Sequence, residues 1–254
     1  SLAAGANINN LRSEHINELQ LPLPKLEEQT RLAAILDKAD AIRRKQQQAL
    51  RLTDDFLSSV FLDMFGDLMS NPRGWPIKAL SEGVAEFEGG RNVMPTDTLR
   101  ADGVRVLKVS AVTSGEYKPH ESKSFDENEE FPDHYIVREG DLLISRANTS
   151  ELVGAVAYVW ETTGREMLPD KLWRFVWPEE GTIDPLFMLH LARSRYFREQ
   201  LIQRATGSSG SMKNIGKAKM LEIPIPYPPI ELQQRFSQIA MRSRQASEAS
   251  IASM

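Results

Sequence analysis

Two short segments place an arginine and an asparagine close together in loops. The first segment is Gly89-Gly90-Arg91-Asn92, and the second is Ser145-Arg146-Ala147-Asn148-Thr149-Ser150, which follows an apolar strand pattern. Arginine can pair with guanine through two N–H groups, and asparagine can pair with adenine in the same two-pronged way. Glycine lets a backbone come close to a phosphate group because it has no side chain. These residue types therefore predict contacts with the bases of DNA.

Further polar residues suit contacts with the phosphate backbone, which fix position and carry no sequence information. Lys108, Lys171, Arg174 and Lys213 are the candidate phosphate partners, and the serines of a Ser/Gly loop at Gly207–Asn214 suit either role. The complete set of candidate DNA contacts is Arg91, Asn92, Lys108, Ser110, Arg146, Asn148, Thr149, Ser150, Lys171, Arg174, Ser208, Ser209, Ser211 and Lys213. Each of these residue types is also common on a solvated surface, so the prediction rests on the set.

The sequence predicts no catalytic site, no metal site and no cofactor of its own. The four histidines are scattered without metal-ligand spacing, and cysteine is absent. Gly216-Lys217 is followed by Ala218, which lacks the hydroxyl group that a phosphate-binding loop uses to hold Mg²⁺. An enzyme acting on nucleic acid by itself remains one alternative, and it would need a cofactor that these motifs do not indicate.

Composition is typical of a soluble globular protein, with 41% hydrophobic and 26% charged residues. We expect a cytoplasmic location, because cysteine is absent and no apolar run approaches the roughly 20 residues that cross a bilayer. The net charge of −4 argues against indiscriminate binding to nucleic acid. Charge is nevertheless uneven, since residues 121–141 are mainly acidic and residues 190–219 mainly basic.

A long helix is predicted from Pro24 to Gly66, with no proline or glycine between Lys25 and Phe65. Its apolar residues recur at steps of three and four, which places them on one face. The predicted pairing residues are Leu32, Ile35, Leu36, Ala39, Ile42, Gln46, Ala49, Leu50, Thr53, Phe56, Leu57 and Val60. This pattern favours a coiled-coil spacer arm, and a single long helix packed on its own domain is the alternative.

A repeat near 200 residues apart suggests how the chain is organised. The segment ELQLPLPKLEEQTR at residues 18–31 parallels MLEIPIPYPPIELQQR at residues 220–235, and each is preceded by a similar Asn-Leu or Asn-Ile pair. A repeat of this length indicates duplication of a whole domain. We expect the tail of a preceding domain at 1–23, a spacer helix at 24–66, a recognition domain at 67–229 and the start of a second helix at 230–254.

The middle of the chain alternates apolar and polar residues as strands do. Strands are predicted at 104–112, 135–147, 153–160 and 172–178, and Asp184-Pro185 begins a helix that is expected to end by Gly207. The predicted class is α+β, with a twisted, partly barrel-like sheet and helices attached to the long coiled-coil-forming helix.

Several segments resemble the specificity subunits of type I restriction-modification systems. The helix entry LPLPKLEEQTRLAAILDKADAIRRKQQQAL, the segment Asn71-Pro72-Arg73-Gly74-Trp75 and the segment REGDLLIS at residues 138–145 are similar to conserved parts of that family. The stretch from Gly207 to Pro226 resembles its target recognition domain. The resemblance covers nearly the whole chain, but only one recognition domain is whole and the second helix stops early.

The resemblance implies a non-catalytic, sequence-specific DNA-recognition subunit that reads one half of a bipartite site. In that family two long antiparallel helices set the distance between two recognition domains and dock the methylation subunits. S-adenosylmethionine, ATP and Mg²⁺ are then expected only in partner subunits, including the restriction subunit. Two copies pairing through their helices would rebuild the two-fold arrangement. The alternative is a coiled-coil assembly module without DNA specificity of its own.

Overall fold

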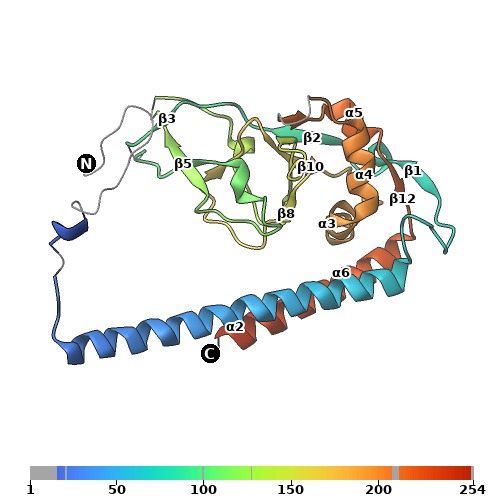
Figure 1. Cartoon of the computed structure of the whole chain (residues 1–254). Coiled ribbons are helices and arrows are strands. Elements are labelled where there is room, and N and C mark those ends of the chain that lie inside the picture. The colour runs from blue at the N-terminus through green and yellow to red at the C-terminus, as the bar shows by residue number, and fades with distance from the viewer. Residues whose placement is uncertain (1–15, 21, 99, 127, 208–211, 253–254) are drawn as a thin grey trace.

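The structure is a computed structural model in which residues 16–20, 22–98, 100–126, 128–207 and 212–252 are described. It contains a globular part and a long helical arm (Figure 1). Within the described ranges, no helix combines the length and the apolar character that crossing a membrane requires. The expected turn at Gly5–Asn10 and the Asn10-Leu11 pair lie outside these ranges.

Helix α2 spans Leu26–Phe65 and is about 60 Å long at 1.5 Å per residue. Glu27 and Glu28 lie in its first turn, where negative charge is stabilised by the helix dipole. The helix ends at Gly66, whose φ of 79° suits glycine and whose N–H donates to the carbonyl oxygen of Leu62. The prediction of one unbroken helix is confirmed.

The chain enters and leaves the globular part at the same place. After α2, the indole N–H of Trp75 donates to the Phe65 carbonyl oxygen at 2.9 Å, which fixes the exit from the helix. Strand β1 (Ile77–Ala79) then pairs antiparallel with β12 (Pro224–Pro226), the last strand before the second long helix. This pairing brings the end of α2 and the start of the second helix together.

Two four-stranded sheets form most of the globular part. The first has the order β2-β10-β6-β8 and is antiparallel throughout. Its strands are β2 (Glu86–Gly89), β10 (Leu172–Val176), β6 (Leu142–Ser145) and β8 (Val156–Tyr158). The second has the order β3-β5-β4-β9, in which β4 and β9 are parallel. Its strands are β3 (Pro95–Thr96), β5 (Ser122–Phe125), β4 (Arg105–Leu107) and β9 (Glu166–Met167).

The α+β class is confirmed, and the described strands form open sheets without a closed barrel. The strands are shorter than the alternating patterns predicted. The pattern at 104–112, for example, divides into β4 and a 3₁₀ turn, Val109–Ala111. Two further 3₁₀ turns are Leu80–Glu82 and Asp133–Tyr135. Local turn geometry ends these strands before their alternation ends.

Three helices follow the sheets: α3 (Pro185–Arg193), α4 (Arg195–Arg204) and α5 (Lys217–Leu221). Asp184 starts α3 as predicted, because its carboxylate accepts the N–H groups of Leu186 and Phe187. The expected single helix up to Gly207 is wrong. Ser194 has an extended backbone, ends α3 and caps α4 by accepting the N–H of Phe197.

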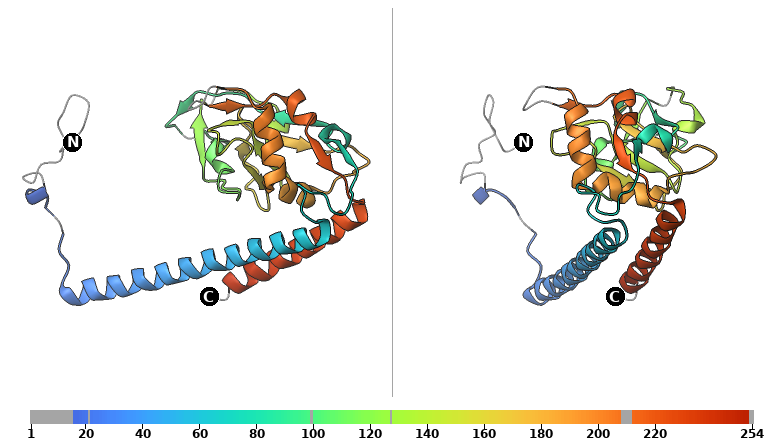
Figure 2. Two further views of the ribbon diagram at one scale, coloured as in Figure 1. Left: turned by 45° about the vertical axis from the view of Figure 1, so that its right-hand side comes forward. Right: turned by 90° about the vertical axis from the view of Figure 1, so that its right-hand side faces the viewer.

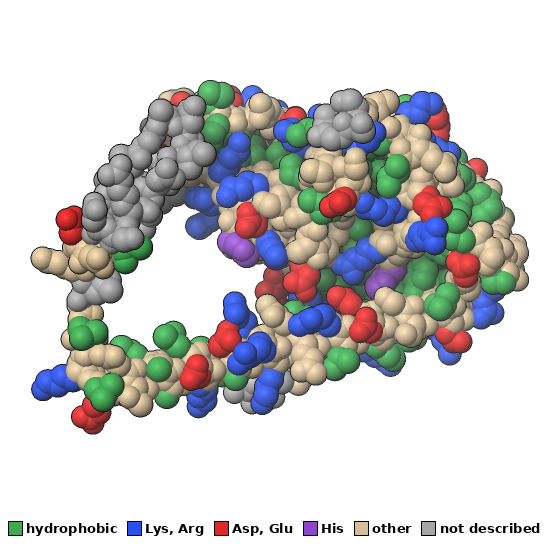
Figure 3. Space-filling model, viewed as in Figure 1, with side chains coloured by type: hydrophobic (Ala, Val, Ile, Leu, Met, Phe, Trp, Pro, Cys, Tyr) green, Lys and Arg blue, Asp and Glu red, His purple; other side chains and the backbone are tan. Residues whose placement is uncertain are grey.

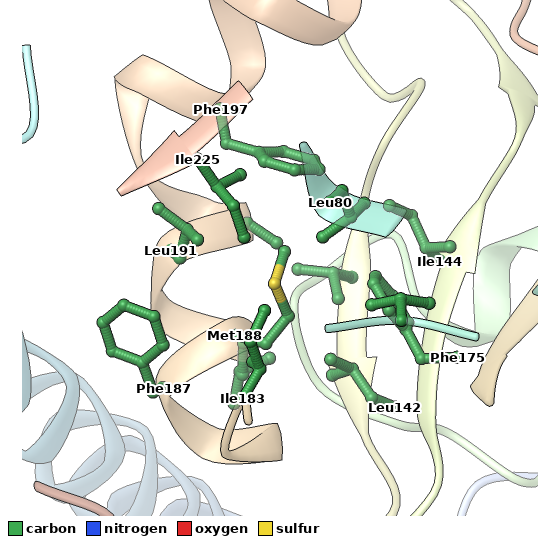
Figure 4. Packing of buried hydrophobic residues seen from close by; sticks show 14 of the residues in the cluster. Leu80, Leu142, Ile144, Phe175, Ile183, Phe187, Met188, Leu191, Phe197 and Ile225 are labelled. Carbon is green, nitrogen blue, oxygen red and sulfur yellow. The ribbon is translucent and has the colours of Figure 1, made fainter. Parts of the chain in front are cut away.

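The main core lies between α3 and the first sheet. Met188 and Leu191 of α3 are fully buried, and Figure 4 shows Met188 on the side of α3 that faces Leu142 and Phe175, with Leu191 beside Ile225. The Phe187 ring points the other way, towards the long helices. Helix α3 therefore connects the sheet with the arm in one continuous core.

Helix α6 (Ile230–Ala252) runs back along the second half of α2 (Figures 1 and 2). Rings from three helices meet where it begins, since Phe61 and Phe65 of α2 contact Phe236 of α6 and Phe187 of α3 at centroid distances of 4.8–5.8 Å. His190 of α3 completes this aromatic cluster, 4.9 Å from the Phe236 ring.

A polar junction accompanies the aromatic cluster. The fully buried amide of Gln233 accepts the N–H of Asp184 and donates to the carbonyl oxygens of Thr182 and Pro228. Ser237 donates to the Asp184 carboxylate that caps α3. Helix α6 is therefore bound to the start of α3 by hydrogen bonds as well as by rings.

The predicted pairing face of α2 has two parts with different surroundings. In the second half, most members are buried or half-buried, namely Ile42, Gln46, Ala49, Leu50, Thr53, Leu57 and Val60. Phe56 is 50% exposed and lies off this face. In the first half, Leu32, Ile35, Leu36 and Ala39 are exposed, and the described part of α6 does not pack on them.

The buried His190 predicts a pH dependence of stability. Burial, with Arg193 nearby, lowers the pKa of His190 to about 3. The unfolded chain binds the proton near pH 6.5, so the free energy of unfolding falls as the pH drops below 6.5. Between pH 6.5 and 5 we expect a loss of about 1.5 kcal/mol in urea unfolding that the His190→Gln variant lacks. His134→Gln, which changes an exposed histidine, should keep this loss, and an identical pH profile in His190→Gln would contradict the assignment.

Candidate nucleic-acid interface

Two very short strands bring together candidate residues from distant parts of the chain. Strand β7 (Ala147–Asn148) pairs antiparallel with β11 (Lys213–Asn214), so that Asn148 lies opposite Lys213. The pairing extends on one side, where the N–H of Ile215 donates to the carbonyl oxygen of Arg146 at 3.0 Å. A predicted amide and a predicted phosphate partner are therefore neighbours.

The Arg146 side chain links this pair of strands to the end of the turn before β10. Its Nε donates to the carbonyl oxygen of Asp170 at 2.7 Å, and Nη2 lies 3.5 Å from the Asp170 carboxylate. Nη1 donates to the Asn214 side chain at 2.9 Å. Of the five N–H groups on a guanidinium, these bonds use three. Arg146 therefore supports the local structure and keeps two donors for another partner.

Trp173, only 6% exposed, lies close to two of the cations. The Arg146 guanidinium carbon is 5.7 Å from the indole ring and the Lys217 nitrogen is 5.9 Å from it, distances at which cations are attracted to the ring. The Lys213 ammonium group donates to the Gly207 carbonyl oxygen at 2.7 Å. We call Arg146, Asn148, Lys171, Lys213 and Lys217 the β7–β11 cluster.

The β7–β11 cluster has an excess of positive charge, with four cations against the Asp170 carboxylate. Lys171 joins it through its carbonyl oxygen, which accepts the Arg146 N–H at 3.1 Å. Helix α5, which carries Lys217, lies on the side of the globular part away from α2 and α6 (Figure 1). In Figure 3, Lys and Arg side chains also border the hollow between the globular part and the first half of α2. Positive charge is therefore present on more than one face.

Other candidates are held by acidic partners on other elements. Ser110 donates to Glu121 at 2.7 Å, and Lys108 lies 3.9 Å from the same carboxylate. The hydrogen bond from Ser110, together with Lys108, lowers the pKa of Glu121. Arg91 forms an ion pair with Glu129 at 3.4 Å, and Asn92 beside it is exposed. Among the described residues, no hydrogen bond or ion pair connects the side chains of these four candidates to the β7–β11 cluster.

The two glycines before Arg91 have a different role from the predicted one. A Cβ atom on Gly90 would lie 1.7 Å from the Leu168 carbonyl oxygen, and one on Gly89 would lie 2.6 Å from the Trp173 ring. Close approach between segments of this chain therefore accounts for both glycines. The expected approach to a phosphate is not needed to explain them.

Arg174, expected to contact phosphate, instead lies in the core at 8% exposure. Its guanidinium donates to Asp141 at 2.9 Å, to Glu88, and to the carbonyl oxygens of Ile136 and His134. Burial raises the pKa of Asp141 even though Arg174 bonds to it. We therefore exclude Arg174 from the interface. The prediction placed it there because the alternation of residues along β10 does not distinguish a charged residue in the core from an exposed one.

The remaining candidates surround the β7–β11 cluster or lie outside the described residues. Thr149 and Ser150 are exposed directly after β7. Ser208, Ser209 and Ser211 lie outside the described residues. Sequence reasoning missed the contributions of Asp170, Trp173, Asn214 and Lys217, and for Lys217 the basic run at 190–219 was the available signal. Among the described residues, no group of three or more acidic or histidine side chains could hold a metal ion.

Comparisons with known proteins agree on one family. The model of the type I restriction modification DNA specificity domain matches residues 1–52. The EcoEI specificity subunit of Escherichia coli is 29% identical over 164 residues, which is 64% of this chain and 27% of that protein. The EcoKI specificity subunit of Escherichia coli K12 is 24% identical over 256 residues, which is 94% of this chain and 54% of that protein. The chain is therefore similar to type I restriction-modification specificity subunits.

A solved structure shares the fold of this chain. The crystal structure of the type I restriction-modification system S subunit from M. genitalium matches with a TM-score of 0.56 and 15% sequence identity. The match covers 99% of this chain and 64% of that one. At this identity the similarity concerns the fold alone. The chain spans about half or less of the length of the two Escherichia coli relatives.

The buried position of Arg174 predicts a large effect on stability. Arg174→Ala removes a buried cation and leaves the partly buried carboxylates of Glu88 and Asp141 without it, and we expect a loss of about 3 kcal/mol in the free energy of unfolding. Arg91→Ala removes an exposed ion pair and should cost less than about 1 kcal/mol. Urea denaturation measures both. Similar small losses in the two variants would show that the Arg174 cluster does not stabilise the core.

Proposed function

We propose that this chain recognises DNA sequence for a type I restriction-modification complex and that the β7–β11 cluster makes the contacts. The observation that carries the proposal is the meeting of four cations and one amide at one place in the fold. The names of the relatives support it, because both Escherichia coli proteins are specificity subunits.

The chemistry of the cluster suits two kinds of DNA contact. Lys171, Lys213 and Lys217 would bind phosphates, and each neutralised phosphate releases condensed counterions and makes affinity depend on salt. The amide of Asn148 and the two remaining donors of Arg146 suit the edges of adenine and guanine. The exposed Thr149 and Ser150 would lie beside them. The site read in this way would be one half of a bipartite sequence.

We infer that the chain is not catalytic and that methylation and ATP-dependent cleavage belong to partner subunits. S-adenosylmethionine, ATP and Mg²⁺ would then bind to those subunits. The similarity to specificity subunits supports this division of labour. The domain boundaries that we propose are a preceding domain's tail at 1–23, the spacer helix at 24–66, the recognition domain at 67–229 and a second helix from 230.

The first half of α2 supports a docking role for the arm. Leu32, Ile35 and Leu36 are 47%, 54% and 68% exposed, and they continue the face on which α6 packs. An apolar face of this length favours burial against another helix. We propose that a methylation subunit docks here, and pairing with a second copy of the chain is the alternative.

The phosphate role of Lys213 predicts a loss of affinity that does not depend on sequence. Selection from a randomised DNA duplex pool at low salt, with the cognate methylation subunit present, should first recover a short motif. Lys213→Ala should then weaken binding to all sequences alike and reduce the slope of log affinity against log salt by about one. Lys78→Ala, which removes a charge from β1, is the control and should keep the wild-type slope.

The base-reading role of Arg146 predicts a different result. Arg146→Ala should cost about 1–3 kcal/mol in binding and relax the preference at one base pair. Because Arg146 also holds Asp170 and Asn214, thermal unfolding of the variant must be measured in parallel. A uniform loss in both the Arg146 and Lys213 variants would contradict the assigned roles, and binding without any motif would favour an assembly module instead.

The exposed face of α2 predicts an effect on assembly. Ile35→Asp should weaken association with the methylation subunit at least about tenfold, because burying an isoleucine contributes about 1.5–3 kcal/mol. Gln48→Asp adds the same charge to the same helix and should leave association unchanged. Analytical ultracentrifugation with and without the partner separates docking from self-association. Equal affinities of the two variants would exclude this face as the docking surface.

A further inference from the structure

A tight turn follows β7 and carries two of the candidate DNA contacts. The Asn148 side chain accepts the N–H of Thr149 at 2.8 Å, and the N–H groups of Leu152 and Val153 donate to the Thr149 carbonyl oxygen at 3.1 and 2.9 Å. The Thr149 and Ser150 side chains are exposed. Their hydroxyl groups are therefore available, and their direction depends on how the turn is held.

Arg198 of α4 holds the tip of this turn from outside. Its Nη2 donates to the Ser150 carbonyl oxygen at 3.0 Å and also to the Glu151 carbonyl oxygen. Both acceptors belong to the backbone, so the contact fixes the path of the turn and leaves the Thr149 and Ser150 hydroxyls unused. Arg198 lies 48 residues from Ser150 in the sequence, and no motif indicated this contact.

Apolar packing secures the base of the turn but not its tip. Val153 is fully buried, and the backbone of Gly154 packs on Leu201 of α4. Beside this base lies a groove of about 920 Å³, which is lined by residues 151–156, by α3 and α4, by the end of α2 and by residues 113–116. The hydrogen bond from Arg198 to the Glu151 carbonyl oxygen joins two parts of this lining. The tip is therefore tied to α4 mainly by one guanidinium group.

We propose that Arg198 is a positioning residue for DNA recognition, which sets the turn so that Thr149 and Ser150 face DNA beside Asn148 and Lys213. This inference rests on the proposed function. A phosphate contact by the Arg198 charge would be a different role, and so would a contribution to stability alone.

Arg195 provides a matched control on the same helix. Its side chain is 84% exposed and bonds to Glu199 of α4, so Arg195→Gln removes the same charge without touching the turn. Arg198→Gln should lower affinity for the selected motif about tenfold relative to Arg195→Gln, the size of one mismatched base pair. Affinity for a scrambled duplex and the salt slope should be the same in both variants.

Arg198→Lys separates positioning from charge. Lysine keeps the charge but places its nitrogen one bond short of the two carbonyl oxygens, so the motif affinity should fall as in Arg198→Gln. A lysine variant that keeps wild-type affinity, or a glutamine variant whose salt slope falls by about one, would overturn the proposal in favour of a phosphate contact. Thermal unfolding should change little, and equal losses of motif and scrambled affinity together with a lowered melting temperature would reveal a purely structural role.

A double-mutant cycle tests the route of the effect. In a Thr149→Ala/Ser150→Ala background, Arg198→Gln should cause no further loss of motif affinity, because the groups that it positions are gone. A full additional tenfold loss would overturn the proposal. If the parent protein and its methylation subunit select no motif at all, the proposed function fails and this inference fails with it. If the parent selects a motif and Arg198→Gln equals Arg195→Gln, this inference alone fails.

Discussion

The aromatic cluster at the base of the arm is the contact on which the rest of the structure depends. Phe61 and Phe65 of α2, Phe236 of α6, and Phe187 and His190 of α3 meet there. Aromatic pairs of this kind contribute about 0.5–1.5 kcal/mol each beyond the area that they bury. Because α3 also packs on the first sheet, the cluster joins both long helices to the β7–β11 cluster through one core. The direction of the arm is therefore set by packing and not by a linker.

Polar contacts around this core are arranged so that buried groups have partners. Gln233 uses its amide on three backbone groups, and the Arg174 guanidinium meets two carboxylates and two carbonyl oxygens. At the arm, Arg193 lies 3.8 Å from Asp54 of α2 and donates to the Gly115 carbonyl oxygen. Burial lowers the pKa of Arg193, which means that removing its charge from water costs free energy that these contacts must offset. These buried polar groups therefore fix the relative positions of the helices and strands as well as stabilising them.

The sequence predicted the elements whose signals are local. The long helix, its end at Gly66 and the start of α3 at Asp184 follow from periodicity and capping residues. The break at Ser194 was missed because a serine suits a cap and tolerates a helix interior. The pairing of β7 with β11 was missed because strands of two residues leave no periodic pattern. The burial of Arg174 and the contribution of Asp170 were both missed for one reason. Their partners lie 86 and 24 residues away in the chain, and contacts at such separations leave no pattern in the local sequence.

The length of α2 makes the arm a lever whose accuracy depends on its base. Over about 60 Å, a rotation of one degree at the aromatic cluster moves the far end by about 1 Å. A small repacking of Phe61 or Phe236 would thus displace any subunit held at the tip by more than the repacking itself. Conversely, a force applied at the tip produces a torque at the base that equals the force multiplied by the arm's length. Rigid rings crossing between three helices resist that torque better than flexible aliphatic side chains would.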